Sequence, residues 1–134
     1  MSVSADVTLY LVAWFLLLLL LLAAYRVSMS MSANKAANSF SPSGSDLPPL
    51  GQRLTRAHAN CYEFLPFALA VLIYAQATGQ AALTDGLAMV FLAARVAQSI
   101  VHIASTSVPA VLIRFLFFII QFAILAYWVI GLLG

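Results

Sequence analysis

The chain has 134 residues, of which 64% are hydrophobic and only 7% are charged. A soluble domain carries about a quarter charged residues, so this composition excludes a soluble globular enzyme, a secreted disulfide scaffold and a disordered tail. Six basic residues with a net charge of +2 form no basic stripe, which excludes a nucleic-acid binder. The single cysteine excludes an intrachain disulfide, and the residue types present provide no metal-site signature. The sequence therefore predicts a small polytopic membrane protein.

Long apolar stretches divide the chain into four predicted helices that form one integral membrane domain. The first stretch carries no charge and is long enough, as a helix, to span about 30 Å of hydrocarbon. Short connections make the last three helices antiparallel neighbours. The prediction is an all-α, four-transmembrane-helix bundle with up-down topology, whose helices cover about residues 7–25, 49–78, 81–105 and 109–133.

Turn-forming residues mark the connections between these helices. Residues 26–46 are rich in Ser and Asn and form the predicted long loop. Asp46 is the candidate N-cap of the next helix, with Pro49 in its first turn. Ser107 and Pro109 carry the same start signal for the last helix.

Basic residues are concentrated on one side of the predicted bundle. Lys and Arg favour the cytoplasmic side of a membrane. The N-terminal tail, the turn at 79–85 and the C-terminus contain no base, and the acids Asp6 and Asp85 lie there instead. We therefore expect both termini in the periplasm or lumen and the long first loop in the cytoplasm. The bases on the loop side are Arg26, Lys35, Arg53, Arg56 and Arg114.

Polar side chains inside the predicted helices form two stripes. A charged residue within a membrane span costs about 2.5–3.5 kcal/mol on insertion scales, so it usually marks a functional site or a paired structural site. Residues three or four positions apart share one helix face. The second helix carries Arg53, Arg56, Asn60 and Glu63 at such spacings, and the third carries Arg95, Gln98 and His102.

The helical rise of about 1.5 Å per residue places both stripes in the cytoplasmic third of the bilayer. Glu63 and Arg95 are then candidate partners, because each buried charge needs one. One interpretation is a structural pair that holds helices or subunits together. The other is a cavity open to the cytoplasm, in which Arg53, Arg56 and Arg114 hold carboxylates and Glu63 holds an ammonium group. Such a cavity suits a small zwitterionic peptide with more than one carboxylate.

Two further polar residues have a structural interpretation. Cys61 lies beside the stripe of the second helix, and we interpret it as a small packing residue because buried thiols in apolar surroundings are unreactive. Gln121, in the last helix, is interpreted as forming an interhelical hydrogen bond.

The segment at 56–66, RAHANCYEFLP, resembles the signature of the MAPEG family, the membrane-associated proteins in eicosanoid and glutathione metabolism. The family pattern is R-A-x-x-N-x-x-E-x-x-P at the start of the second helix. Chain length, four helices, a polar first loop and arginines in the third helix and near the start of the fourth also resemble the family. The resemblance implies a homotrimer with glutathione as co-substrate, bound between subunits near the cytoplasmic side, without a metal or redox prosthetic group.

The resemblance also implies roles for individual residues. Arg114 or Arg95 would stabilise the glutathione thiolate and is the candidate catalytic residue. Gln98 and His102 depart from the family pattern, which has His or Tyr and then Tyr at these two places in the eicosanoid enzymes. The candidate glutathione-binding residues are Arg26, Arg53, Arg56, Asn60, Glu63, Gln98 and His102.

The implied function is that of a glutathione-dependent membrane transferase or peroxidase, acting on lipophilic electrophiles or lipid hydroperoxides that arrive from the bilayer. Because the stripe of the third helix departs from the family pattern, an alternative function stays open. In this alternative the protein is a non-catalytic MAPEG-like binding or scaffold protein, such as an accessory subunit of a larger membrane complex. A transporter or channel is disfavoured because the chain has neither an internal repeat nor a glycine-broken span.

Overall fold

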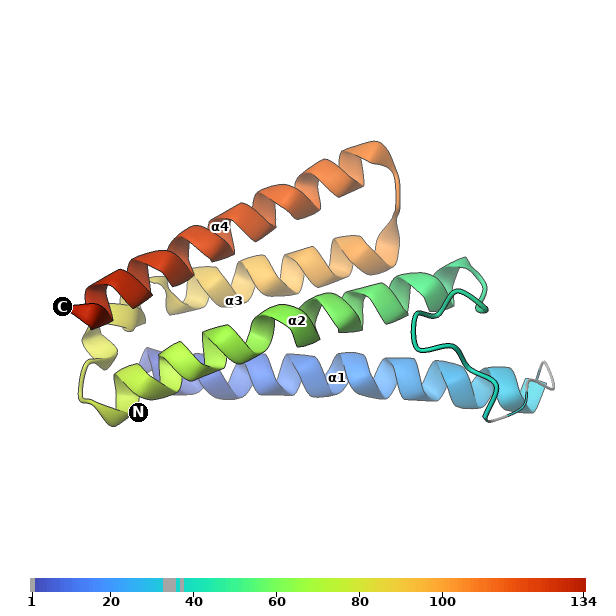
Figure 1. Cartoon of the computed structure of the whole chain (residues 1–134), viewed down its shortest axis with the longest axis horizontal. Coiled ribbons are helices and arrows are strands. Elements are labelled where there is room, and N and C mark those ends of the chain that lie inside the picture. Colours follow the sequence, from blue (N-terminus) through green and yellow to red (C-terminus); the bar gives the residue numbers. More distant parts are fainter. Residues whose placement is uncertain (1, 33–35, 37) are drawn as a thin grey trace.

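The computed structural model describes residues 2–32, 36 and 38–134, so Lys35 of the predicted loop lies outside the described residues. Four long helices lie side by side in an up-down bundle, which confirms the predicted fold class (Figure 1). Both chain ends lie at one end of the bundle, and the α1–α2 and α3–α4 connections lie at the other (Figure 1). The helices are α1 (Val3–Ser32), α2 (Pro49–Ala77), α3 (Ala81–Ala104) and α4 (Val108–Leu133).

Helix α1 is longer at both ends than the predicted 7–25. It continues to Ser32, because residues 26–32 contain neither Pro nor Gly to stop a helix. Arg26 therefore lies within a helix, and the prediction of a loop beginning at residue 26 is wrong. The other three helices begin and end within one residue of the predicted bounds.

The two predicted N-caps have different outcomes. Ser107 caps α4, because its hydroxyl accepts a hydrogen bond from the backbone N–H of Ala110 at 3.3 Å. Asp46 does not cap α2, which begins after Pro48 without a side-chain cap. The Asp46 carboxylate instead accepts a bond from the backbone N–H of Ser41 at 3.1 Å. A proline in the first turn is compatible with a start that lacks this cap.

The apolar core fills the half of the bundle that is nearer to the chain ends. Phe91 of α3 and Trp128 of α4 are fully buried there, with ring centroids 5.5 Å apart. Apart from Thr84 near the start of α3, the buried polar residues of that helix are Arg95, Gln98 and Ser99, which come later, toward the connection to α4. The core residues are Val7, Leu11, Leu65, Ala68, Leu72, Ala88, Phe91, Ile124 and Trp128.

Three of the described helices, α1, α3 and α4, are long and apolar enough to cross a membrane. Their exposed sides carry many large apolar side chains, which suit contact with lipid rather than with water. Helix α2 is of similar length but carries the polar stripe that begins at Arg53, which lowers its apolar character.

A carboxylate from α3 caps the start of α1. The first N–H groups of a helix have no partner inside that helix. Asp85 accepts hydrogen bonds from the backbone N–H of Ser4 at 2.8 Å and from its hydroxyl at 2.6 Å. Thr84 adds a hydroxyl contact to Ser4, and both residues are fully buried. This cluster therefore joins α1 to α3 at the end of the bundle where the chain begins.

Replacing Asp85 with alanine should lower the free energy of unfolding by about 1–2 kcal/mol, since both bonds to Ser4 are lost. Thermal unfolding of the protein in detergent measures this difference. Asp6→Ala is the control, because it removes a carboxylate at the same end and leaves the cap intact. Equal losses in the two variants would contradict the capping role.

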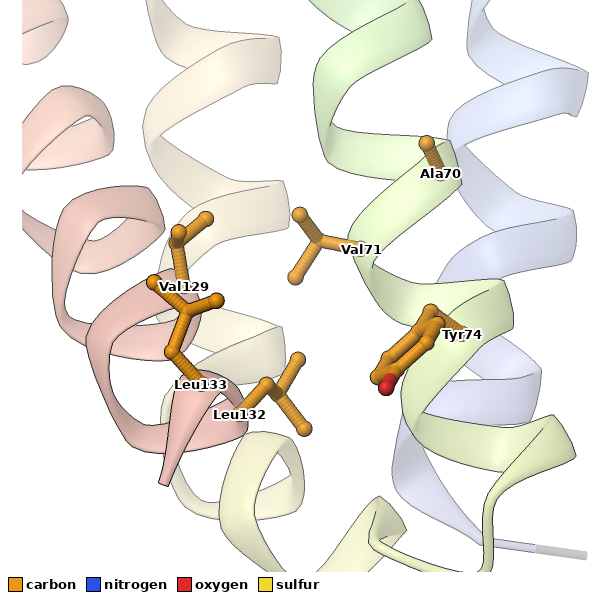
Figure 2. Close-up of a pocket in the computed structure, with 6 residues that line it drawn as sticks. All are labelled: Ala70, Val71, Tyr74, Val129, Leu132 and Leu133. Carbon is orange, nitrogen blue, oxygen red and sulfur yellow. The ribbon is translucent and has the colours of Figure 1, made fainter.

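An apolar groove separates α2 from α4. It has a volume of about 540 Å³ where phenylalanines of both helices line it. Near the end of α4, Tyr74 and Val71 of α2 face Leu132 and Leu133 of α4 across a second pocket (Figure 2). The sides of α2 and α4 that line this groove therefore have little contact with each other. The groove is lined by Phe64, Phe67, Ala70, Val71, Phe118, Phe122, Leu125 and Val129.

Candidate functional site

The guanidinium of Arg95 lies at the centre of the loop-side half of the bundle. Its side chain is 1% exposed. Nε donates a hydrogen bond to Oε1 of Gln121 at 2.8 Å, and Nη1 donates to Oδ1 of Asn60 at 2.5 Å. The Sγ atom of Cys61 lies 3.7 Å from the same Nη1 atom. Arg95 thus joins α3 to α2 and to α4.

Among the described residues, the groups in direct contact with this charge are uncharged. The ring centroid of Phe64 lies 5.2 Å from the guanidinium carbon. The Nη2 atom is buried and has no hydrogen-bond partner in the described part of the chain. A buried charge that lacks a counter-ion is strongly unfavourable. The surroundings of Arg95 are therefore suited to an anionic ligand.

The expected pair between Glu63 and Arg95 does not form. Glu63 is exposed, whereas Arg95 is buried among uncharged partners. The buried side of α2 carries Ala57, Cys61 and Leu65, which turns Glu63 away from the bundle. The two polar stripes are bonded to each other through Asn60 and Arg95 rather than through two charges.

His102 and Arg114 form a second contact, nearer to the α3–α4 connection. Nη1 of Arg114 lies 2.7 Å from Nδ1 of His102. Arginine can only donate, so Nδ1 accepts and the neutral ring carries its proton on Nε2. Arg56 and Arg95 also lie close enough to interact electrostatically with His102. One guanidinium therefore contacts a neutral imidazole, and two more lie within electrostatic range of it.

The remaining predicted arginines lie elsewhere at the same end of the bundle. Nε of Arg53 donates a hydrogen bond to the carbonyl of Ile103 at 2.7 Å, a favourable place for a cation because it is the C-terminus of a helix. Arg26 packs on the ring of Phe40, 5.9 Å from its centroid, and lines a groove of about 540 Å³ between α1 and the loop. Within the described residues, neither arginine is bonded to Arg95 or His102.

The sequence analysis interpreted Gln121 and Cys61 as structural residues outside the site, and it did not single out Ser99. The interhelical bonding of Gln121 and the buried packing of Cys61 are confirmed. Ser99 donates a hydrogen bond to the Arg95 carbonyl at 3.0 Å and accepts one from the indole of Trp14 at 3.0 Å. The sequence signal that could have placed Gln121 in the site was its amide side chain, which stands in a predominantly apolar stretch after Arg114.

The model of the MAPEG family matches residues 6–134, nearly the whole chain. The chain belongs to the MAPEG family. Comparison with curated proteins and with solved structures gave no significant match. The family match confirms the resemblance that the motif at 56–66 indicated, and it makes this chain a membrane protein of a family associated with glutathione and eicosanoid metabolism.

In this MAPEG protein the three motif residues differ in their surroundings. Arg56 and Glu63 are exposed on α2, and Asn60, half-buried between them, is bonded to Arg95. Among the residues that the structure describes, no group of three His, Cys, Asp or Glu side chains could hold a metal ion. Arg95 and Arg114 supply hydrogen-bond donors and positive charge at this site.

Proposed function

We propose that this MAPEG protein is a glutathione-dependent membrane transferase or peroxidase that acts on lipophilic electrophiles or lipid hydroperoxides. The observation that carries this proposal is the contact between Arg114 and His102, with Arg95 and Arg56 within electrostatic range of the same ring. Glutathione carries two carboxylates and an ionisable thiol, so it matches these three arginines in charge. Family membership supports glutathione over other small anions.

The positive charge would activate the thiol. A free thiol has a pKa of about 8.5, so little thiolate exists at neutral pH. A guanidinium within about 4 Å favours the anion and lowers this pKa by one unit or more. The thiolate then attacks an electrophilic carbon, where the new C–S bond replaces the bond to a leaving group. With a lipid hydroperoxide it attacks the terminal oxygen, the O–O bond breaks, the lipid alcohol leaves after taking up a proton, and a second glutathione converts the sulfenic acid to glutathione disulfide and water. Arg114 and Arg95 are the candidates for this role.

A homotrimer with glutathione bound between neighbouring subunits is part of the proposal. Arg56 and Glu63 are exposed on one side of α2 in the isolated chain. Charges that face lipid are unfavourable, so a neighbouring copy of the chain would cover them and share the site. The concentration of bases at the loop end supports a cytoplasmic first loop, with both termini in the periplasm or lumen.

Glutathione binding by the detergent-solubilised protein, measured by calorimetry, tests the proposal. Glu63→Gln removes the partner for the ammonium group, and Arg56→Ala removes a partner for a carboxylate. We expect each change to weaken binding about tenfold or more, the equivalent of one charged hydrogen bond. Asp6→Ala, at the opposite end of the bundle, is the control and should bind normally. Absence of binding at millimolar glutathione would exclude a glutathione-dependent enzyme activity.

A non-catalytic binding or scaffold protein is the second candidate function. The observation that favours it is the departure at Gln98 and His102, where an amide and a neutral imidazole stand in place of the family's residues. Glutathione-dependent turnover separates the two candidates. Stoichiometric copurification of another membrane protein, without turnover, would favour an accessory subunit of a larger complex.

A further inference from the structure

The side-chain amide of Gln121 has one possible orientation. The residue is fully buried. Its Nε2 atom donates to the backbone carbonyl of Phe117 at 3.0 Å and to Oε1 of Gln98 at 2.7 Å. Its Oε1 atom accepts from Nε of Arg95 at 2.8 Å. A carbonyl only accepts and a guanidinium only donates. Exchange of the amide oxygen and nitrogen of Gln121 would therefore break the bonds to the Phe117 carbonyl and to Arg95.

This orientation determines the polarity of the neighbouring groups. The amide oxygen of Gln98 is occupied by Gln121, and that of Asn60 is occupied by Arg95. Among the described residues, Nη2 of Arg95 is buried without a partner, and Nε2 of Gln98 and Nδ2 of Asn60 are the amide nitrogens left beside the bonded oxygens. All three can only donate hydrogen bonds. N–H donors and one positive charge, beside amide oxygens that each already accept a hydrogen bond, favour an anion.

We propose that Gln121 is the positioning residue of an anion subsite whose hydrogen-bond donors are Arg95, Asn60 and Gln98. The ligand is an anionic group of glutathione, either its thiolate or a carboxylate, so this inference rests on the proposed function. Gln121 itself does not touch the ligand. It holds the Arg95 guanidinium and binds the oxygen of the Gln98 amide, which leaves the N–H groups of Gln98 available to the ligand.

The route to this subsite passes Phe64. Its ring lies over the Arg95 guanidinium and also lines the apolar groove between α2 and α4. The anion subsite and the groove for lipophilic molecules therefore adjoin at one side chain, which would bring a polar and an apolar substrate together.

The test compares Gln121→Met with Gln76→Met. Gln76 is a matched control because its amide also donates to a side chain and a backbone carbonyl, Thr8 Oγ1 and Leu72, both at 3.0 Å. Glutathione affinity, the pH titration of thiolate absorbance and the unfolding temperature are measured for both. We expect Gln121→Met to weaken glutathione binding about tenfold, whereas Gln76→Met changes only the unfolding temperature. S-methylglutathione separates the two anions, because a thiolate subsite predicts that Gln121→Met binds this analogue normally.

Gln121→Glu provides a second test if the methionine variant does not fold. A carboxylate keeps the acceptor for Arg95 but supplies its own negative charge to the subsite, so glutathione binding should be lost while the bundle stays folded. Normal glutathione affinity in a folded Gln121 variant overturns the inference and leaves the proposed function standing. A wild-type protein that does not bind glutathione overturns the proposed function, and this inference with it.

Discussion

Replacing Arg95 with alanine is expected to abolish glutathione binding and to lower the free energy of unfolding by about 3 kcal/mol. Two buried oxygen atoms, on Asn60 and Gln121, would lose their hydrogen-bond donor. The space left by the guanidinium would add the penalty of a cavity. Calorimetry with glutathione and thermal unfolding in the same detergent measure the two effects separately.

Two controls sharpen this experiment. Arg95→Lys keeps the charge but cannot reproduce both directed bonds of the guanidinium, so we expect weakened binding and a smaller loss of stability. Arg53→Ala removes an arginine that bonds only to a backbone carbonyl in the described residues, and it should destabilise the protein by about 1 kcal/mol. Full stability of Arg95→Ala would contradict a central role for this guanidinium.

Replacing Arg114 with alanine is expected to lower kcat/KM for glutathione conjugation by about 10²–10³, the usual loss when one stabilising donor is removed. Binding of glutathione should change only a few-fold, because Arg56, Asn60 and Glu63 are retained. The loss also frees His102 from the bond that determines its tautomer. Turnover with a lipophilic electrophile and glutathione binding, measured on the same preparation, provide the comparison.

Arg114→Lys and Arg95→Lys together distinguish the two candidate thiolate partners. If Arg114 stabilises the thiolate, Arg114→Lys retains part of the turnover and Arg114→Ala retains almost none. Turnover that survives Arg114→Ala but not Arg95→Lys would assign the thiolate to Arg95 instead. Unchanged turnover in all of these variants would contradict catalysis by either arginine.

Local sequence signals predicted most of the fold. Four apolar stretches, with Ser107 before the last, identified four helices, because helix starts and spans depend on residues that are close in the sequence. The exceptions were the two ends of α1, which extend beyond the predicted 7–25, and the N-cap of α2, which is not Asp46. Residues 26–32 contain three serines, and Ser45 and Asp46 precede α2. Such side chains can bond either inside a helix or in a loop. Neighbouring residues alone do not decide between the two.

The motif at 56–66 indicated the family from the sequence alone, and helix periodicity correctly grouped Arg95 with Gln98 on one buried face. Periodicity defines a face, but not how far that helix is rotated toward its neighbours. Because of that rotation, Arg95 donates hydrogen bonds to Asn60 and Gln121 and does not pair with Glu63. The same rotation brings Gln121 of α4 into the site. Only the packed helices decide these partners, because a hydrogen bond needs atoms within about 3 Å.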